Sequence, residues 1–275
     1  MKLTMAFSPC PNDTFIFEPI VNDRIDTEGL EFVFTIADVE ELNRAAFSGI
    51  PDITKLSYHA YMYVADSYIL LNSGSALGYG NGPLLISKLP VNQQEVSELH
   101  IAIPGKYTTA NLLLGIAFPG AVNKTEYLFS DIEDAILTGK VNAGLIIHEN
   151  RFTYEKKGLR KIVDLGEYWE KKTGLPIPLG GIAVHRRIPF EIRRKVDRTL
   201  KRSIEYARNN PDTTLEFVRQ YAQEMDRDVM LRHIDLYVNE FTRELGAEGK
   251  KAVKLLFQTA WRNGLIDPVT EKIFD

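Results

Sequence analysis

The first half of the chain alternates short strand-like runs with helix-like runs, and this order restricts the fold more than any other feature. Residues 31–37 place Phe32, Phe34 and Ile36 on one face with the period of two that is typical of a strand. Residues 39–47 follow with a helical pattern closed by Gly49. Further strands are expected at 52–56 and 68–71. Strands alternating with helices predict an α/β fold with a mainly parallel sheet covered by helices.

The middle of the chain repeats this plan, and the last third becomes helical. A strand is expected at 100–103, followed by helices at 109–117 and 131–138. From Glu191 onward, apolar residues spaced by four face a strongly basic opposite side, which predicts a long amphipathic helix. Pro211 is placed as a first-turn proline of the next helix.

Two stretches rich in glycine and proline, 74–83 and 174–181, divide the chain. If the chain crosses to a second lobe after the first stretch and returns after the second, the middle third is an inserted lobe. We therefore expect a larger lobe of residues 1–88 and 182–275 and a smaller lobe of residues 89–181. Two lobes joined by two crossings form a central cleft with hinges.

Composition narrows the classes of partner. The chain has 275 residues, of which 44% are hydrophobic and 25% charged, and its net charge of −4 argues against nucleic-acid binding. The single cysteine, Cys10, excludes an intramolecular disulfide and a cysteine-built zinc site, and no histidine pair has metal-ligand spacing. No segment has the length of a membrane span or of a signal-peptide core. We expect a cytoplasmic protein with no metal and no membrane partner.

The run from Ala143 to His148 is the best indication of chemistry. A short apolar stretch rich in β-branched residues stops at a histidine, as expected for a strand buried on both faces. Ligands of parallel sheets gather at the carboxyl ends of strands, where His148 would lie. Histidine is the side chain whose ordinary pKa allows proton exchange near neutral pH. His148 is therefore our candidate for an acid–base group.

Two turns, at 8–14 and 104–109, share one design: each follows a strand and opens a helix. Free backbone N–H groups and the helix dipole favour an anion there, although Asn12, Thr108 and Thr109 could equally be ordinary helix caps. Lys55 could attract an anion or be a solvated strand end. Cys10, near a helix start where the dipole lowers a thiol pKa, could be reactive, but simple packing is favoured.

Several motifs together resemble one family, the 1,4-dihydroxy-6-naphthoate synthases of the futalosine route to menaquinone. They occur in the expected order and are SPCPNDTFIF at 8–17, DVEELN at 38–43, TKLSY at 54–58, GKYTTA at 105–110, GLIIHE at 144–149, RFTY at 151–154 and GLPIPLG at 174–180. The resemblance implies a two-lobed, periplasmic-binding-protein-like (type II) fold with a central cleft.

The resemblance also implies a carbon–carbon lyase. Its substrate would be the carboxylated small molecule cyclic dehypoxanthinylfutalosine, released as 1,4-dihydroxy-6-naphthoate and dihydroxyacetone without a metal or redox cofactor. The proton acceptor of the family falls on His148. Its substrate-binding segments fall on Lys55, Leu56, Ser57, Thr109 and Ala110.

Two other functions stay open at this point. A cytoplasmic carboxylate-binding sensor would share the fold and release its ligand unchanged. Chorismate dehydratase of the same pathway resembles this fold and also takes a carboxylated substrate. The motifs at 8–17 and 144–154 favour the naphthoate synthase over the dehydratase. The oligomeric state is left open by the sequence.

Overall fold

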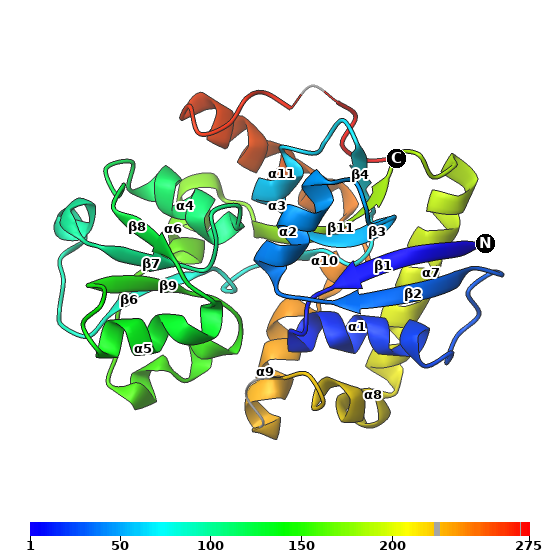
Figure 1. Ribbon diagram of the computed structural model, residues 1–275, viewed down its shortest axis with the longest axis horizontal. Helices are drawn as coiled ribbons and strands as arrows, with labels where there is room; N and C mark the ends of the chain where they lie inside the picture. Colours follow the sequence, from blue (N-terminus) through cyan, green and yellow to red (C-terminus); the bar gives the residue numbers. More distant parts are fainter. Residues whose placement is uncertain (223–225, 270) are drawn as a thin grey trace.

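Two β-sheets, each in its own lobe, organise the computed structural model, which describes residues 1–222, 226–269 and 271–275 (Figure 1). The first sheet has the order β2-β1-β3-β11-β4, with β5 also paired to β11. Its strands are β1 (Lys2–Phe7), β2 (Glu31–Ile36), β3 (Ile53–Ser57), β4 (Tyr68–Leu70), β5 (Ala76–Gly78) and β11 (Ile177–His185). The second sheet has the order β10-β6-β9-β7-β8. Its strands are β6 (Leu84–Ser87), β7 (Ile101–Ile103), β8 (Lys124–Glu126), β9 (Ala143–Ile146) and β10 (Arg160–Asp164).

Both sheets are mixed, whereas the sequence led us to expect a mainly parallel sheet. β1 is parallel to β2 and β3, and β7 is parallel to β8 and β9. In contrast, β11 is antiparallel to β3, β4 and β5, and β6 is antiparallel to β9 and β10. The reason is the return of the chain: β1 and β3 run toward the second lobe, so β11, which comes back from it, runs the opposite way.

Helices cover both lobes. They are α1 (Pro11–Val21), α2 (Val39–Phe47), α3 (Tyr58–Tyr61), α4 (Thr109–Ala117), α5 (Ile132–Leu137), α6 (Leu165–Thr173), α7 (Phe190–Asn209), α8 (Pro211–Val218), α9 (Arg227–Tyr237), α10 (Glu240–Arg243) and α11 (Gly246–Arg262), with short 3₁₀ turns η1 (Gln93–Glu98), η2 (Phe129–Asp131), η3 (His148–Phe152) and η4 (Tyr154–Lys157). The long basic helix is α7, whose apolar stripe packs on α1. Its basic face forms surface ion pairs, including Arg198 and Arg202 with Glu28.

The chain crosses between the lobes twice, and the pairing of strands locates both crossings. The outward crossing lies between β5 and β6, and the return lies between β10 and β11 (Figure 1). Residues 84–87, expected in the larger lobe, pair in the second sheet, and residues 177–181, expected in the smaller lobe, pair in the first. The sheets thus place each crossing a few residues before the boundary that we expected.

A hydrophobic core continues from one lobe into the other. One cluster of buried side chains includes Leu56 of the first sheet, Leu145 of the second and Leu113 of α4. Helix α11 adds Val253 and Leu256 to the same cluster. Separate clusters fill the α1–α7 side of the first lobe and the α5 side of the second. The shared core holds the two sheets at a defined separation, and the pocket described below lies between them.

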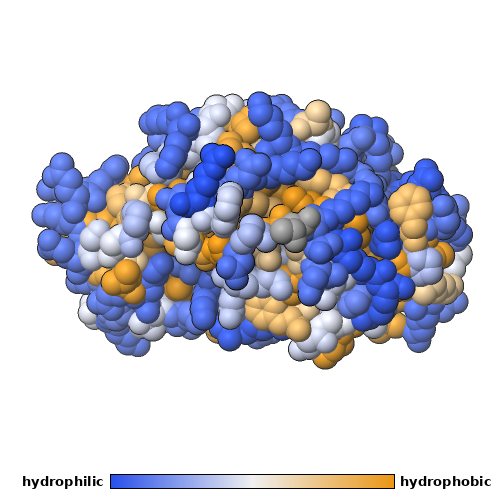
Figure 2. Space-filling view, turned by 90° about the horizontal axis from the view of Figure 1, so that it is seen from above, coloured by the Kyte–Doolittle hydropathy of each residue, from blue (hydrophilic) through white to orange (hydrophobic). Residues whose placement is uncertain are grey.

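Seen from above, one face of the molecule is covered mainly by hydrophilic side chains, with hydrophobic ones in small separate groups (Figure 2). In the described part of the chain, no helix is both long and apolar enough to cross a bilayer.

Candidate active site

A pocket between the two lobes brings together all the site residues that the sequence predicted. The segments that follow the carboxyl ends of β1, β7 and β9 contribute to its wall, together with the last residues of β3 itself. The space between these walls, with the open mouth included, is about 650 Å³. The predicted residues in its lining are Lys55, Leu56, Ser57, Thr109, Ala110 and His148.

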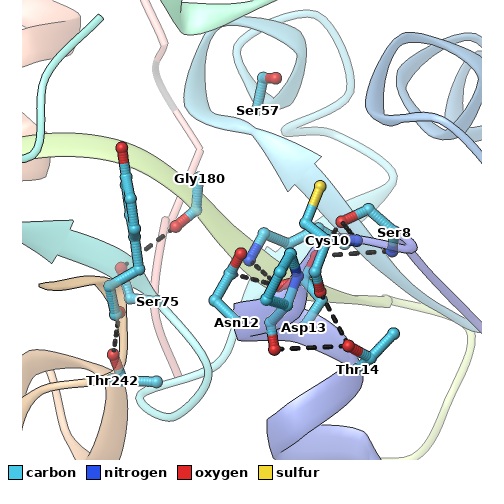
Figure 3. Close-up of polar contacts among 12 residues, drawn as sticks. Ser8, Cys10, Asn12, Asp13, Thr14, Ser57, Ser75, Gly180 and Thr242 are labelled. Atoms are coloured by element: carbon cyan, nitrogen blue, oxygen red, sulfur yellow. Dashed lines mark hydrogen bonds and ion pairs between the residues drawn. The ribbon is translucent and has the colours of Figure 1, made fainter. Parts of the chain in front are cut away.

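Asp13 organises the start of α1 at this pocket. Its carboxylate accepts hydrogen bonds from the Ser8 hydroxyl at 2.6 Å and from the Asn12 amide at 2.8 Å. Figure 3 shows these three side chains turned toward one another beside Cys10. The sequence suggested that Asn12 caps the helix, but Cys10 is the N-cap and no side chain caps it. The polar groups of this turn are joined to one another instead.

Lys55 completes the Asp13 cluster. Its Nζ lies 2.6 Å from Asp13 Oδ1, and both side chains are almost fully buried. Lys55 is therefore not the solvated strand end that we considered. The pair brings a positive and a negative charge to the pocket wall without adding net charge, since a buried charge requires a partner.

The start of α4 forms another part of the pocket wall. Thr108 caps this helix by accepting a hydrogen bond from the backbone N–H of Asn111, and the Thr109 hydroxyl donates to the Leu179 carbonyl of β11 at 2.5 Å. The first backbone N–H groups of a helix have no partner within it, so those of Thr109 and Ala110 are available to a ligand. The Ser57 hydroxyl accepts from Asn43 at 3.1 Å, which orients it at the same wall. This wall suits a carboxylate.

His148 lies directly after β9 in a constrained backbone conformation. Its φ of 58° is in the left-handed region, which is uncommon for a non-glycine residue and is often found at functional sites. Burial lowers the pKa of His148 to about 4, while the Asp13 charge opposes and the Lys55 charge adds to this shift. The imidazole is thus neutral at pH 7 and able to accept a proton.

Phe129 and Cys10 contact the His148 ring. The Phe129 ring meets it edge-on at 4.7 Å between centroids, and Cys10 Sγ lies 3.5 Å from Nε2. Burial, with the charges of Glu149 and Asp13, raises the pKa of the Cys10 thiol well above its ordinary value. This is opposite to the shift that the helix dipole alone would produce. The neutral thiol can donate its hydrogen to the imidazole.

His233 is a site neighbour that sequence reasoning missed. It is fully buried and lies 6.4 Å from His148 between ring centroids. Its Nε2 lies 3.0 Å from Asn12 Oδ1 and must carry the hydrogen, because a carbonyl oxygen only accepts. Tyr237, which lines the pocket, stacks on the His233 ring at 4.4 Å. The apolar spacing of α9 gave no signal that this helix reaches the site.

Contacts beside the pocket hold the lobes together. The Glu40 carboxylate of α2 accepts from the Tyr107 backbone N–H of the second lobe at 3.2 Å. His59 does not line the pocket. Its Nδ1 forms a hydrogen bond with the Thr108 carbonyl oxygen at 3.2 Å. Burial lowers the pKa of His59 to about 4. Both contacts depend on the lobes being close together.

No metal site accompanies these residues. Within residues 1–222, 226–269 and 271–275, no group of three or more His, Cys, Asp or Glu side chains is arranged to hold a metal ion.

The fold and the pocket define a two-lobed protein of the periplasmic-binding-protein-like class. The alkanesulfonate-binding protein SsuA from Xanthomonas axonopodis superposes with a TM-score of 0.71 at 12% identity, covering 96% of this chain and 94% of that one. At this identity the similarity concerns the fold alone. A crystal structure of a protein from Archaeoglobus fulgidus is nearer, with a TM-score of 0.92 and 36% identity over 96% of this chain and 98% of that chain.

The chain belongs to the menaquinone biosynthesis family, whose model matches residues 3–262. A 1,4-dihydroxy-6-naphthoate synthase from Thermus thermophilus is 44% identical over 99% of this chain and 98% of its own length. The enzyme of the same name from Streptomyces coelicolor is 39% identical, over 96% of this chain and 94% of its own length. These relatives confirm the family resemblance drawn from the motifs.

Proposed function

We propose that this chain is a 1,4-dihydroxy-6-naphthoate synthase that cleaves cyclic dehypoxanthinylfutalosine into 1,4-dihydroxy-6-naphthoate and dihydroxyacetone. The names of the two relatives support the product. One observation about the site carries the proposal: a buried, neutral histidine faces the same pocket as a helix start suited to a carboxylate.

The carboxylate of the substrate would bind at the start of α4. The N–H groups of Thr109 and Ala110 and the hydroxyl of Ser57 provide its donors, and the helix dipole favours its charge. Lys55 is neutralised by Asp13, so it shapes this wall and adds little charge to the recognition. A ligand held by its carboxylate at this wall would extend across the pocket toward His148.

His148 would act as the general base. Its neutral imidazole removes the proton of a hydroxyl group on the sugar-derived portion of the substrate. The O–H electron pair forms a carbonyl, the adjacent carbon–carbon bond breaks, and its electron pair passes into the ring that becomes aromatic. Electrons move within the substrate alone, so this route needs no metal or redox cofactor. General-base catalysis of this kind contributes roughly 10²–10⁴-fold to the rate.

The Asp13 charge would assist His148 during the reaction, whereas the Lys55 charge acts against it. The Asp13 charge favours the protonated imidazole, and this interaction strengthens as the proton arrives. Burial has the opposite effect, keeping the imidazole neutral until the substrate is bound. The contacts between Glu40 and Tyr107 hold the lobes close, which excludes water from the bond that breaks.

Product analysis with purified protein tests the proposal. The unsubstituted protein should form the naphthoate from cyclic dehypoxanthinylfutalosine, while His148→Ala should bind the substrate and form roughly 10²–10⁴-fold less. His148→Asn is the matched variant, because asparagine tolerates positive φ and lacks a basic nitrogen. Substrate bound but recovered unchanged by the unsubstituted protein would indicate a binding protein instead. If the protein neither binds nor cleaves this substrate, chorismate is the next substrate to test.

A further inference from the structure

Asn81 buries an amide that has no hydrogen-bond partner in the part of the chain that the structure describes. The residue is fully buried, and it lies on the outward crossing between β5 and β6, where it lines the pocket. Neither Nδ2 nor Oδ1 has a hydrogen-bond partner among the residues that the structure describes. Most buried side-chain amides in proteins are hydrogen-bonded, because an unpaired one is costly. An amide kept in this state at a pocket wall is suited to a group on a ligand.

The backbone around Asn81 is fixed by two neighbours. The Tyr237 hydroxyl donates to the Asn81 carbonyl at 3.0 Å, and Arg151 Nη1 donates to the Gly82 carbonyl at 2.5 Å. Arg151 is itself held by Asp164 at 2.5 Å. The side chain is therefore presented from a rigid segment, although its own amide is unpaired.

Gly78 provides the space for this amide. A Cβ atom at Gly78 would lie 2.9 Å from Asn81 Nδ2, closer than side chains approach one another in proteins. The absence of a side chain at this position leaves Asn81 in place beside the pocket.

Asn81 lies on the His148 side of the pocket. Arg151, which bonds Gly82, belongs to the same 3₁₀ turn that begins at His148. Tyr237, which bonds Asn81, stacks on His233 beside the His148 ring. The carboxylate site at α4 is formed by other residues, which leaves the Asn81 amide available to the part of the ligand on which His148 acts.

We propose that Asn81 determines substrate specificity by binding neutral hydroxyl or carbonyl groups of the sugar-derived portion. An amide offers two donors and one acceptor and carries no charge, which matches a hydroxyl group better than a carboxylate. The inference rests on the proposed function and adds a recognition residue to it. Because the dihydroxyacetone fragment takes these groups away, the naphthoate product would leave Asn81 without a partner again.

The test compares two ligands on Asn81→Leu, which keeps the volume of the side chain and removes both polar groups. Calorimetry is carried out in the His148→Asn background, in which the substrate is not cleaved, and should show that Asn81→Leu reduces the affinity for cyclic dehypoxanthinylfutalosine about 10–100-fold, as when hydroxyl groups of a ligand lose their partners. The affinity for 1,4-dihydroxy-6-naphthoate should stay within about threefold. The melting temperature without ligand should be unchanged or higher, because an unpaired buried amide has been removed. Asn81→Ala provides the same comparison if leucine does not fit.

Asn239→Leu is the matched control. Asn239 also lies beside Gly78, but its Nδ2 donates to the Leu77 carbonyl at 2.9 Å and its Oδ1 caps α10. This variant should lower the melting temperature and leave the ratio of the two affinities unchanged. The inference is wrong if the affinity of Asn81→Leu for the substrate is within about twofold of that of the same protein with Asn81 in place. It is also wrong if the affinities for the substrate and for the naphthoate fall equally. The proposed function is tested separately, by measuring naphthoate formation with the unsubstituted protein. If no naphthoate is formed, the proposed function is wrong, and the inference about Asn81 is wrong with it.

Discussion

Cys10 Sγ lies 3.5 Å from His148 Nε2, although 138 positions separate the two residues. Cys10 is the N-cap of α1 in the first lobe, and His148 begins η3 just after β9 in the second, so this contact joins the two lobes. The raised thiol pKa makes Cys10 a hydrogen donor to the imidazole, not a nucleophile.

We therefore expect Cys10 to be unreactive in the folded protein. A thiol-specific chromogenic disulfide at pH 8 should modify it slowly, because the thiolate is scarce and the side chain is buried. The same reagent should modify one thiol at once in denaturant. Rapid reaction of the native protein would contradict the assignment of a neutral, buried thiol.

The low pKa of His148 predicts an unusual pH dependence of the reaction. A histidine with its ordinary pKa would lose its function as a base below about pH 6.5. With the pKa lowered to about 4, the imidazole stays neutral, so the acid limb of kcat/KM should lie well below pH 6.5. A pH–rate profile from pH 4 to 8 measures this limb. If the acid limb of kcat/KM lies at pH 6.5 or above, His148 is not the group that titrates, or burial does not control its pKa.

His59 should make the protein less stable as the pH falls. The unfolded chain binds a proton at this histidine below about pH 6.5, whereas the folded protein does not until about pH 4. His59→Gln removes this difference, so its stability relative to the unsubstituted protein should rise by up to about 1.4 kcal/mol per pH unit between pH 6 and 4.5. Denaturant unfolding at several pH values measures the change. A constant difference between the two proteins would show that His59 titrates alike in both states.

Breaking the Lys55–Asp13 pair should be strongly destabilising. Asp13→Asn leaves the buried ammonium of Lys55 without its counter-charge, at a cost of roughly 3–5 kcal/mol in the free energy of unfolding. Adding Lys55→Met to this variant removes the unpaired charge and should restore part of the stability. Urea denaturation of the single and double variants provides the comparison. A double variant less stable than Asp13→Asn would show that the lysine has a stabilising role beyond the pair.

Gly105→Ala should weaken the contact between the lobes. Gly105 has a φ of 152°, and a Cβ there would lie 2.6 Å from the Glu40 carboxylate, which binds the next turn of the chain. Displacing this loop by overpacking costs about 1–3 kcal/mol, so KM should rise on the order of 10-fold. Gly139→Ala is the control, because its φ of 75° is strained but no atom lies near its Cβ. Equal KM values for both variants would argue against a role of this contact in binding.

Much of the architecture could be predicted because local periodicity sets the elements. The expected helices at 39–47 and 109–117 match α2 and α4, and the strand at 31–37 matches β2 to within one residue. Polar groups at the carboxyl ends of strands were a good indication of the pocket, since neighbouring strand ends meet at one sheet edge. The order of the motifs was enough to predict the family.

The hydrogen bonds and the ion pair within the site depended on the tertiary structure. Asn12 meets His233 across 221 positions, and Lys55 meets Asp13 across 42. Such contacts arise from the way α9 and β3 pack against the start of α1, and packing over long separations leaves no periodic pattern in the chain. The same holds for the antiparallel β11 and for the unpaired amide of Asn81. Local side-chain pattern specified the strands and helices of this protein, whereas long-range packing decided which polar groups are paired, buried and neutral at its pocket.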